Sequence, residues 1–192
     1  MPETTPNPTT PPPPPSSVPT LPPIDPRALL ATAIAVVKNP TEFFRGIKGE
    51  TGFAKCLVFS VAAAAVYGAL LFVSALLRGI IYGAFGNAIG VAIQALIIAV
   101  IVFGLLGPFL GGLIVWGVSM IFGSKAPYEP SVRIAAYSAA VMPAMGVASF
   151  IAPVWILYFL VSLAISAYAI YIAVMGAKVL NFDAPAAPTT TA

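Results

Sequence analysis

The sequence has no histidine and only one cysteine, Cys56, among its 192 residues. The absence of histidine excludes an imidazole general base, a Ser-His-Asp or Cys-His nucleophile, and any site that needs an imidazole ligand. A single cysteine excludes a disulfide within the chain and a cluster of thiolate metal ligands. Known catalytic sequence motifs are also absent. The sequence therefore predicts a protein that is not an enzyme and that binds no cofactor or metal.

Charged residues are scarce as well. They make up 8% of the chain, whereas 59% is hydrophobic and the mean hydropathy is +0.98. A soluble domain is typically about 25% charged, because a water-exposed surface cannot be covered without charge. The composition therefore predicts an integral membrane protein in contact with the lipid bilayer. The net charge of +3 comes from few residues and gives no reason to expect nucleic acid binding.

Proline and threonine mark the two ends of the sequence. Residues 1–26 hold 12 of the 20 prolines and have little apolar surface to bury, which predicts a disordered tail. Residues 179–192 end in a similar composition and predict a second, flexible tail. Between the tails we expect an amphipathic interfacial segment at residues 27–55 and a transmembrane bundle at residues 56–178.

Three long stretches carry no charged residue, at residues 56–77, 79–124 and 134–177. A helix needs about 20 apolar residues to cross the hydrocarbon core, so the first stretch fits one helix and the others fit two each. We expect a turn at Gly104–Pro108, a kink at Pro143 and a new helix near Pro153. The predicted fold is an all-α membrane bundle of five transmembrane helices, at about 56–77, 88–106, 108–123, 131–150 and 154–178.

A short helix is predicted just before the first span. Asn39 can serve as its N-cap, and Pro40 fits its first turn, where a missing N–H costs nothing. Its apolar side chains share one face, which would lie in the membrane interface with the cations at the headgroups. The residues predicted to meet the membrane are Phe43, Phe44, Ile47, Arg45 and Lys48, and Leu30, Ile34 and Val37 form a similar stripe before them. Packing of both segments on the bundle is the alternative.

Small residues recur at a spacing of four in the predicted spans. Such pairs let helix backbones approach closely in lipid, although an Ala- and Gly-rich chain also produces them by chance. Together they predict a compact bundle that assembles with itself or with a partner membrane protein. The pairs include Gly86/Gly90, Gly107/Gly111 and Ala136/Ala140.

Polar residues are rare inside the predicted spans. No acidic residue occurs between Glu50 and Glu129, so proton-coupled transport is not expected. Gln94 is the most polar side chain in mid-span, and we interpret it as a contact between helices rather than a substrate ligand. The alternative function is a small-solute channel or transporter, with a path lined by Gln94, Asn87, Ser119 or Ser138.

Five helices would place the two ends of the chain on opposite sides of the membrane. Five basic residues precede the first span, and four would lie on the other side. This is a weak bias under the positive-inside rule. Because the first flank often dominates the orientation, we expect the N-terminus in the cytoplasm.

Two segments resemble the Yip1 domain family of multi-span membrane proteins. Residues 37–47, which include Pro40, are similar to the family's Asn-Pro-x-x-Phe-Phe-x-x-Ile segment ahead of the first span. Residues 122–143 resemble its loop and fourth span, with Pro143 one residue later than in the commonest form. The matching positions there are Gly123, Tyr128, Tyr137, Ser138 and Pro143.

The resemblance covers roughly residues 37–178 and implies a five-helix bundle with a cytoplasmic N-terminus. In eukaryotic members it implies vesicle trafficking through prenylated small GTPases and partner membrane proteins. The Tyr-Gly-Pro signature of those members is absent, since Ala69 follows Tyr67 and Gly68. The chain is more similar to bacterial members, for which the family supplies no settled activity. We therefore expect a multi-pass protein of a bacterial cell membrane, acting as a scaffold or organising factor through helix packing and lipid or partner contacts.

Overall fold

The computed structural model describes residues 25–182, and every regular element in this part of the chain is helical. The outer parts of both predicted tails, residues 1–24 and 183–192, lie outside the described residues. In chain order the elements are α1 (Pro26–Lys38), α2 (Pro40–Gly46), α3 (Ala54–Ile81), α4 (Phe85–Ile98), the π-helix η1 (Ala99–Leu106), α5 (Gly107–Ile121), α6 (Tyr128–Ser138), the 3-10 helix η2 (Ala139–Val141), α7 (Met142–Ala148), the 3-10 helix η3 (Ser149–Ile151), α8 (Trp155–Ala177) and the π-helix η4 (Lys178–Phe182).

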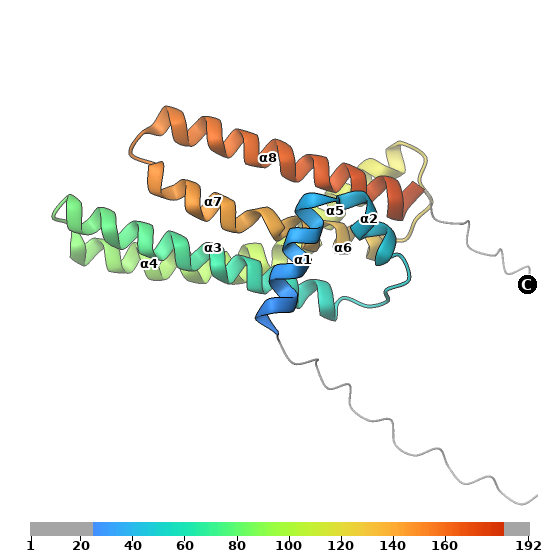
Figure 1. Ribbon diagram of the computed structural model, residues 1–192, viewed down its shortest axis with the longest axis horizontal. Helices are drawn as coiled ribbons and strands as arrows, with labels where there is room; N and C mark the ends of the chain where they lie inside the picture. Colours follow the sequence, from blue (N-terminus) through green and yellow to red (C-terminus); the bar gives the residue numbers. More distant parts are fainter. Residues whose placement is uncertain (1–24, 183–192) are drawn as a thin grey trace, which may run out of the picture.

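Four long helical segments lie side by side and alternate in direction (Figure 1). By length and composition each can cross a membrane, as expected of a multi-pass membrane protein. The described part of the chain therefore confirms an all-helical membrane fold, with four candidate spans in place of the predicted five. These spans are Ala54–Ile81, Phe85–Ile121, Tyr128–Ile151 and Trp155–Phe182.

The difference in count arises at the predicted turn Gly104–Pro108. The two predicted helices at 88–106 and 108–123 are parts of one continuous helix, Phe85–Ile121. A proline inside a helix removes one hydrogen bond and crowds the carbonyl four residues earlier. Here the wider π-helical turns of η1 precede Pro108, which occupies the first turn of α5, so the helix continues through it. Local π adjustments of this kind are a known accommodation of proline in membrane helices.

The third candidate span, Tyr128–Ile151, lies close to the predicted helix at 131–150. Its α-helical turns stop at Ser138, pass through η2, and resume at α7, where Pro143 lies in the first turn. The α-helical turns are therefore interrupted directly before Pro143, the residue at which the sequence predicts a kink. Pro153 lies in the short turn before Trp155, so α8 begins two residues after the proline rather than at it.

Close packing of α3 against the second long helix depends on small residues. A Cβ atom built on Gly68 would come within 2.9 Å of the Cβ atom of Ala99, and one built on Gly104 would come within 3.0 Å of that of Ala64. In lipid, such close approach replaces the hydrophobic driving force that packs helices in water. Glycine at these positions therefore brings the α3 backbone directly against α4 and η1.

The last helix extends beyond the predicted span. The predicted flexible tail begins at residue 179, but η4 continues the helix to Phe182, and Asn181 within it is 4% exposed. Its side-chain Nδ2 donates hydrogen bonds to Ser119 Oγ at 2.9 Å and to Ser131 Oγ at 3.0 Å. Ser124 Oγ in turn donates to the backbone oxygen of Asn181 at 2.7 Å. These bonds fix the C-terminal turn to α5 and α6.

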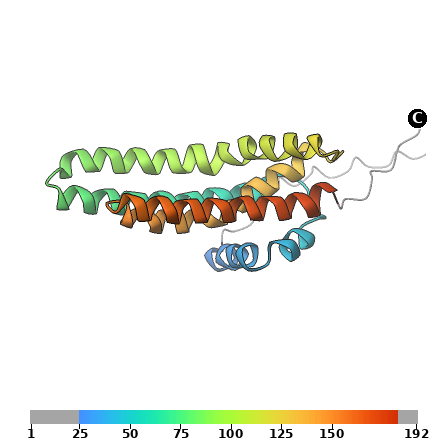
Figure 2. The same cartoon turned by 90° about the horizontal axis from the view of Figure 1, so that it is seen from above.

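The two short helices form a separate layer on the side of the bundle away from α4 and α5 (Figure 2). Asp25 caps α1 by accepting from the Arg27 amide, and Asn39 caps α2 by accepting from the Glu42 amide, as predicted for Asn39. Val36 is fully buried, so α1 is seated on the bundle. Between α2 and α3, the linker crosses the end of the bundle and leads to a group of polar contacts.

Candidate functional site

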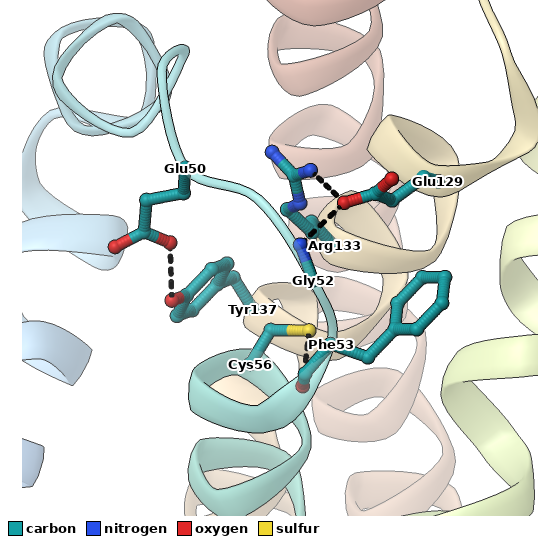
Figure 3. Close-up of polar contacts among 7 residues, drawn as sticks. All are labelled: Glu50, Gly52, Phe53, Cys56, Glu129, Arg133 and Tyr137. Carbon is teal, nitrogen blue, oxygen red and sulfur yellow. Dashed lines mark hydrogen bonds and ion pairs between the residues drawn. The ribbon is translucent and has the colours of Figure 1, made fainter. Parts of the chain in front are cut away.

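Polar side chains gather where the linker from α2 to α3 meets the first turns of α6. We call this group the polar junction, and Figure 3 shows its residues as sticks. Its polar contacts join segments that are about 80 residues apart in sequence, at the end of the bundle that carries α2. The junction consists of Glu50, Gly52, Phe53, Cys56, Glu129, Arg133 and Tyr137.

The first half of the junction is an ion pair on α6. Arg133 is 5% exposed, and its Nη2 pairs with Glu129 Oε1 one helical turn earlier. The same carboxylate oxygen accepts a hydrogen bond of 2.6 Å from the backbone amide of Gly52 (Figure 3). A buried guanidinium is tolerated only when it is paired, so Glu129 neutralises Arg133 and holds the linker at once. Gly52 has a φ of 78°, a left-handed conformation that glycine adopts without strain.

The second half links the linker to the next turn of α6. The Tyr137 hydroxyl donates to Glu50 Oε2 at 3.3 Å, and Lys55 Nζ lies 3.4 Å from Glu50 Oε1. The thiol of Cys56, buried at the start of α3, donates to the Phe53 carbonyl oxygen at 3.1 Å. Both acidic residues of the polar junction therefore have partners in the chain. Their contacts hold the linker between α2 and α3 against α6.

A cavity of about 390 Å³ lies beside the polar junction, between α1, α2 and the start of α3. Apolar side chains such as Phe43 and Phe59 line it, together with the charged groups of Asp25, Glu50 and Lys55. Such a mixture of apolar walls with charges of both signs is typical of a membrane–water interface rather than of the hydrocarbon core.

The structure turns one predicted membrane-facing residue inward. Phe44 is fully buried and packs against Gly176 and Ile134 instead of facing lipid. The 3.6-residue period shows which side chains share a face but not which neighbour covers that face, and here α8 covers it. Phe43 is half-buried, with its ring 4.9 Å from that of Tyr137 between centroids.

The remaining residues predicted to meet the membrane are not buried. Arg45 and Lys48 are exposed, and Ile47 is half-buried beside the cavity. The apolar stripe on α1 is the part that faces outward, with Leu30 63% and Ile34 45% exposed. The outer apolar surface of this layer therefore belongs to α1 rather than to the phenylalanines of α2.

The residues that carried the family resemblance lie in turns or at contacts between helices. Pro40 is buried in the first turn of α2, and Gly123 ends α5 with a φ of 86°. The Tyr128 hydroxyl donates to the Phe109 carbonyl oxygen at 2.6 Å, which ties the start of α6 to α5. Tyr137 belongs to the polar junction, and Pro143 restarts the helix at α7. These residues form turns and contacts between helices, and Tyr137 also lines the cavity of about 390 Å³.

The predicted packing residues are only partly at helix crossings. Ala136 and Ala140 are buried, and a Cβ atom built on Gly111 would lie 3.1 Å from the Cβ atom of Ala135. Gly107 meets only a carbonyl oxygen of its own helix. The crossing of α5 and α6 is closest at the neighbouring Gly112, where a Cβ atom would come within 2.8 Å of the Val132 Cα.

The residues proposed for a solute path are not brought together. Gln94 and Asn87 are exposed on the outside of α4. Ser119 is buried and accepts from Asn181, and the Ser138 hydroxyl donates to the Ile134 carbonyl oxygen of its own helix. Sequence reasoning missed Asn181, because a polar residue near the end of the last apolar stretch carries no sign of burial.

Comparison with protein families gives one match, to the Yip1 domain, over residues 34–191. Comparison with curated proteins and with solved structures found no match. The family model covers most of the chain, including the polar junction, all four candidate spans and both segments in which the resemblance was seen. The chain belongs to the Yip1 domain family.

Proposed function

We propose that this protein is a non-enzymatic membrane scaffold, which organises a partner membrane protein or further copies of itself through helix packing. Its long helices leave much of their surface uncovered by the rest of the chain. In α8 only Ile172 and Gly176 are buried among 23 residues. In a membrane, surface of this kind contacts either lipid or another helix, and the distribution of small and polar residues separates the two.

The observation that carries the proposal is the outer face of α4. Gly86, Gly90 and Gln94 follow one another at a spacing of four and are all exposed. A Cβ atom on either glycine would meet no neighbouring atom within 4 Å, so the face is open. Gln94 lies about two and a half turns into the helix, at a depth where hydrocarbon cannot hydrogen-bond its amide. A second helix that packs on the glycines would bring a partner for this amide.

The basic residues support one orientation. Four spans place both ends of the bundle's chain on the same side, and the turns Ile81–Phe85 and Ile151–Trp155 on the other. Eight of the nine Lys and Arg residues then lie at the end with α1 and α2, and Arg78 alone lies at the opposite end. Under the positive-inside rule we place the end with α1 and α2 in the cytoplasm.

Site-specific photocrosslinking in native membranes tests the scaffold role. A photoreactive residue at Ile97, 52% exposed and one turn beyond Gln94, is expected to give discrete protein adducts. The same residue at the buried Ile172 is the control and should give none. The substitution Gln94→Leu should reduce the Ile97 adducts, whereas Gly117→Leu, at an open glycine of α5, should leave them unchanged.

Two results would count against the scaffold. Adducts with lipid alone at Ile97 would show that no helix packs on this face. Solute flux through reconstituted vesicles, abolished by Gln94→Leu, would favour the small-solute channel or transporter instead.

A further inference from the structure

A second outer surface differs in character from the small-residue face of α4. It is a groove of about 580 Å³ between α5 and the C-terminal part of α8. Its walls are long apolar side chains, and the half-buried Ala173 and Ala177 lie between them. The walls are formed by Ile114, Val118, Phe122, Ile170, Val174 and Phe182.

The groove opens sideways from the bundle. Ile114 is 67%, Phe122 75% and Ile170 65% exposed, although Ile114 and Ile170 lie on helices apolar enough to span the membrane and Phe122 directly follows one. Along α8 the groove runs from Ile170 to Phe182, which corresponds to about 18 Å of helix at 1.5 Å per residue. These dimensions and the apolar lining suit one extended acyl chain.

One cation, Lys178, lies in the C-terminal part of this groove, one turn before Phe182. Lys178 lines the groove, is exposed, and forms no ion pair with any residue that the structure describes. It belongs to the first turn of η4, at the bundle end that carries most of the basic residues. A lysine near a helix end extends its ammonium to the membrane surface while its methylene stem stays along apolar side chains.

Hydrogen bonds fix the turn that carries this cation. Asn181, three residues after Lys178, donates to Ser119, which itself lines the groove. Asn181 also donates to Ser131 on α6, so η4 is held at two points. The position of the ammonium relative to the groove is therefore set by the fold and not by a free chain end.

We propose that this groove binds one anionic phospholipid, with an acyl chain along α5 and α8 and the phosphate beside Lys178. The charge at the membrane-surface end complements an anionic headgroup, and the apolar body complements the chain. A partner helix is a poorer match, because the walls of Ile, Val and Phe rise on both sides of Ala173 and Ala177 and would keep a helix backbone away from these small residues. The proposal requires only that the chain lies in a bilayer and does not depend on the scaffold role.

The test uses the full-length protein in nanodiscs of mixed phosphatidylglycerol and phosphatidylcholine, with retained lipid counted by native mass spectrometry. Lys178→Gln should lower retained phosphatidylglycerol about fivefold, the effect of one basic contact at a membrane surface, and leave phosphatidylcholine unchanged. Lys125→Gln removes an exposed charge from the same end outside the groove and should have little effect.

A second pair of variants tests the apolar part of the site. Ala173→Phe fills the groove and should remove the retained phosphatidylglycerol, whereas Ala167→Phe, exposed on α8 outside the groove, should not. An equal loss of retained phosphatidylglycerol in Lys178→Gln and Lys125→Gln would show that general surface charge causes the effect, and would overturn the proposal. Retained lipid unaffected by Ala173→Phe, with loss of a dimer instead, would overturn it in favour of a second copy.

Discussion

The ring of Phe44 lies against the backbone of Gly176, so that a Cβ atom at residue 176 would come within 2.8 Å of Phe44 Cε2. This contact seats α2 on the last long helix and explains why an aromatic residue ahead of the first span turns inward. It also joins the N-terminal layer to the bundle, in addition to the contacts that bury Val36 of α1. The contact is expected to be sensitive to small changes in volume.

Added volume at residue 176 should destabilise the protein, and a smaller side chain at residue 44 should relieve part of that loss. Gly176→Ala is expected to lower the free energy of unfolding by about 1–3 kcal/mol, because the Cβ atom overpacks Phe44 and Ile134. Combined with Phe44→Leu, the loss should be smaller than the sum of the two single losses, with a coupling above about 0.5 kcal/mol. Tryptophan fluorescence during denaturant unfolding in detergent measures both. Additive losses would show that the two residues do not meet.

The ion pair of the polar junction should contribute measurably to the stability of the folded protein. Glu129→Gln leaves the guanidinium of Arg133 buried without a counter-charge and should lower the free energy of unfolding by about 1–3 kcal/mol. Removal of both charges in Glu129→Gln with Arg133→Met should restore part of the loss, since an apolar side chain can fill a buried site. Glu42→Gln, at an exposed carboxylate of α2, is the control. A double variant no more stable than Glu129→Gln would contradict this interpretation.

The outer stripe of α1 is expected to lie in the membrane interface. A spin label at Ile34 should be more accessible to oxygen, which dissolves in lipid, than to a water-soluble nickel reagent. A label at Arg45, exposed on α2, should show the opposite preference. The reason is that α1 presents its exposed apolar side chains outward, whereas α2 presents its cations. Preference for the nickel reagent at both positions would show that α1 lies in water.

Local sequence patterns predicted the local structure well. The Asn39–Pro40 helix start depends on nearest neighbours along the chain, and it is present. Membrane character was readable because charges are confined to the ends of the apolar stretches, and the family resemblance was readable from residues 37–47 and 122–143. The continuous helix through Pro108 was not readable, because π-helical turns have no sequence pattern of their own.

Contacts between distant segments were beyond the reach of the sequence. Periodicity placed Phe43, Phe44 and Ile47 on one face, but only the fold decides that α8 covers it. In the same way, the contact that joins Glu129, the partner of Arg133, to Gly52 depends on the linker crossing the bundle end. The correction from five spans to four also converts a weak charge bias into a strong one, since Lys125, Arg133 and Lys178 move to the basic end.

The number of membrane crossings is the central claim, and cysteine labelling in intact cells tests it most directly. In a Cys56→Ser background, single cysteines replace Gly49, Lys125, Tyr82 and Val154, all of which are exposed. With four spans, an impermeant maleimide should label Tyr82→Cys and Val154→Cys and leave Gly49→Cys and Lys125→Cys unlabelled until the cells are opened. Labelling of Lys125→Cys together with Tyr82→Cys, and protection of Val154→Cys, would contradict the four-span account and restore five.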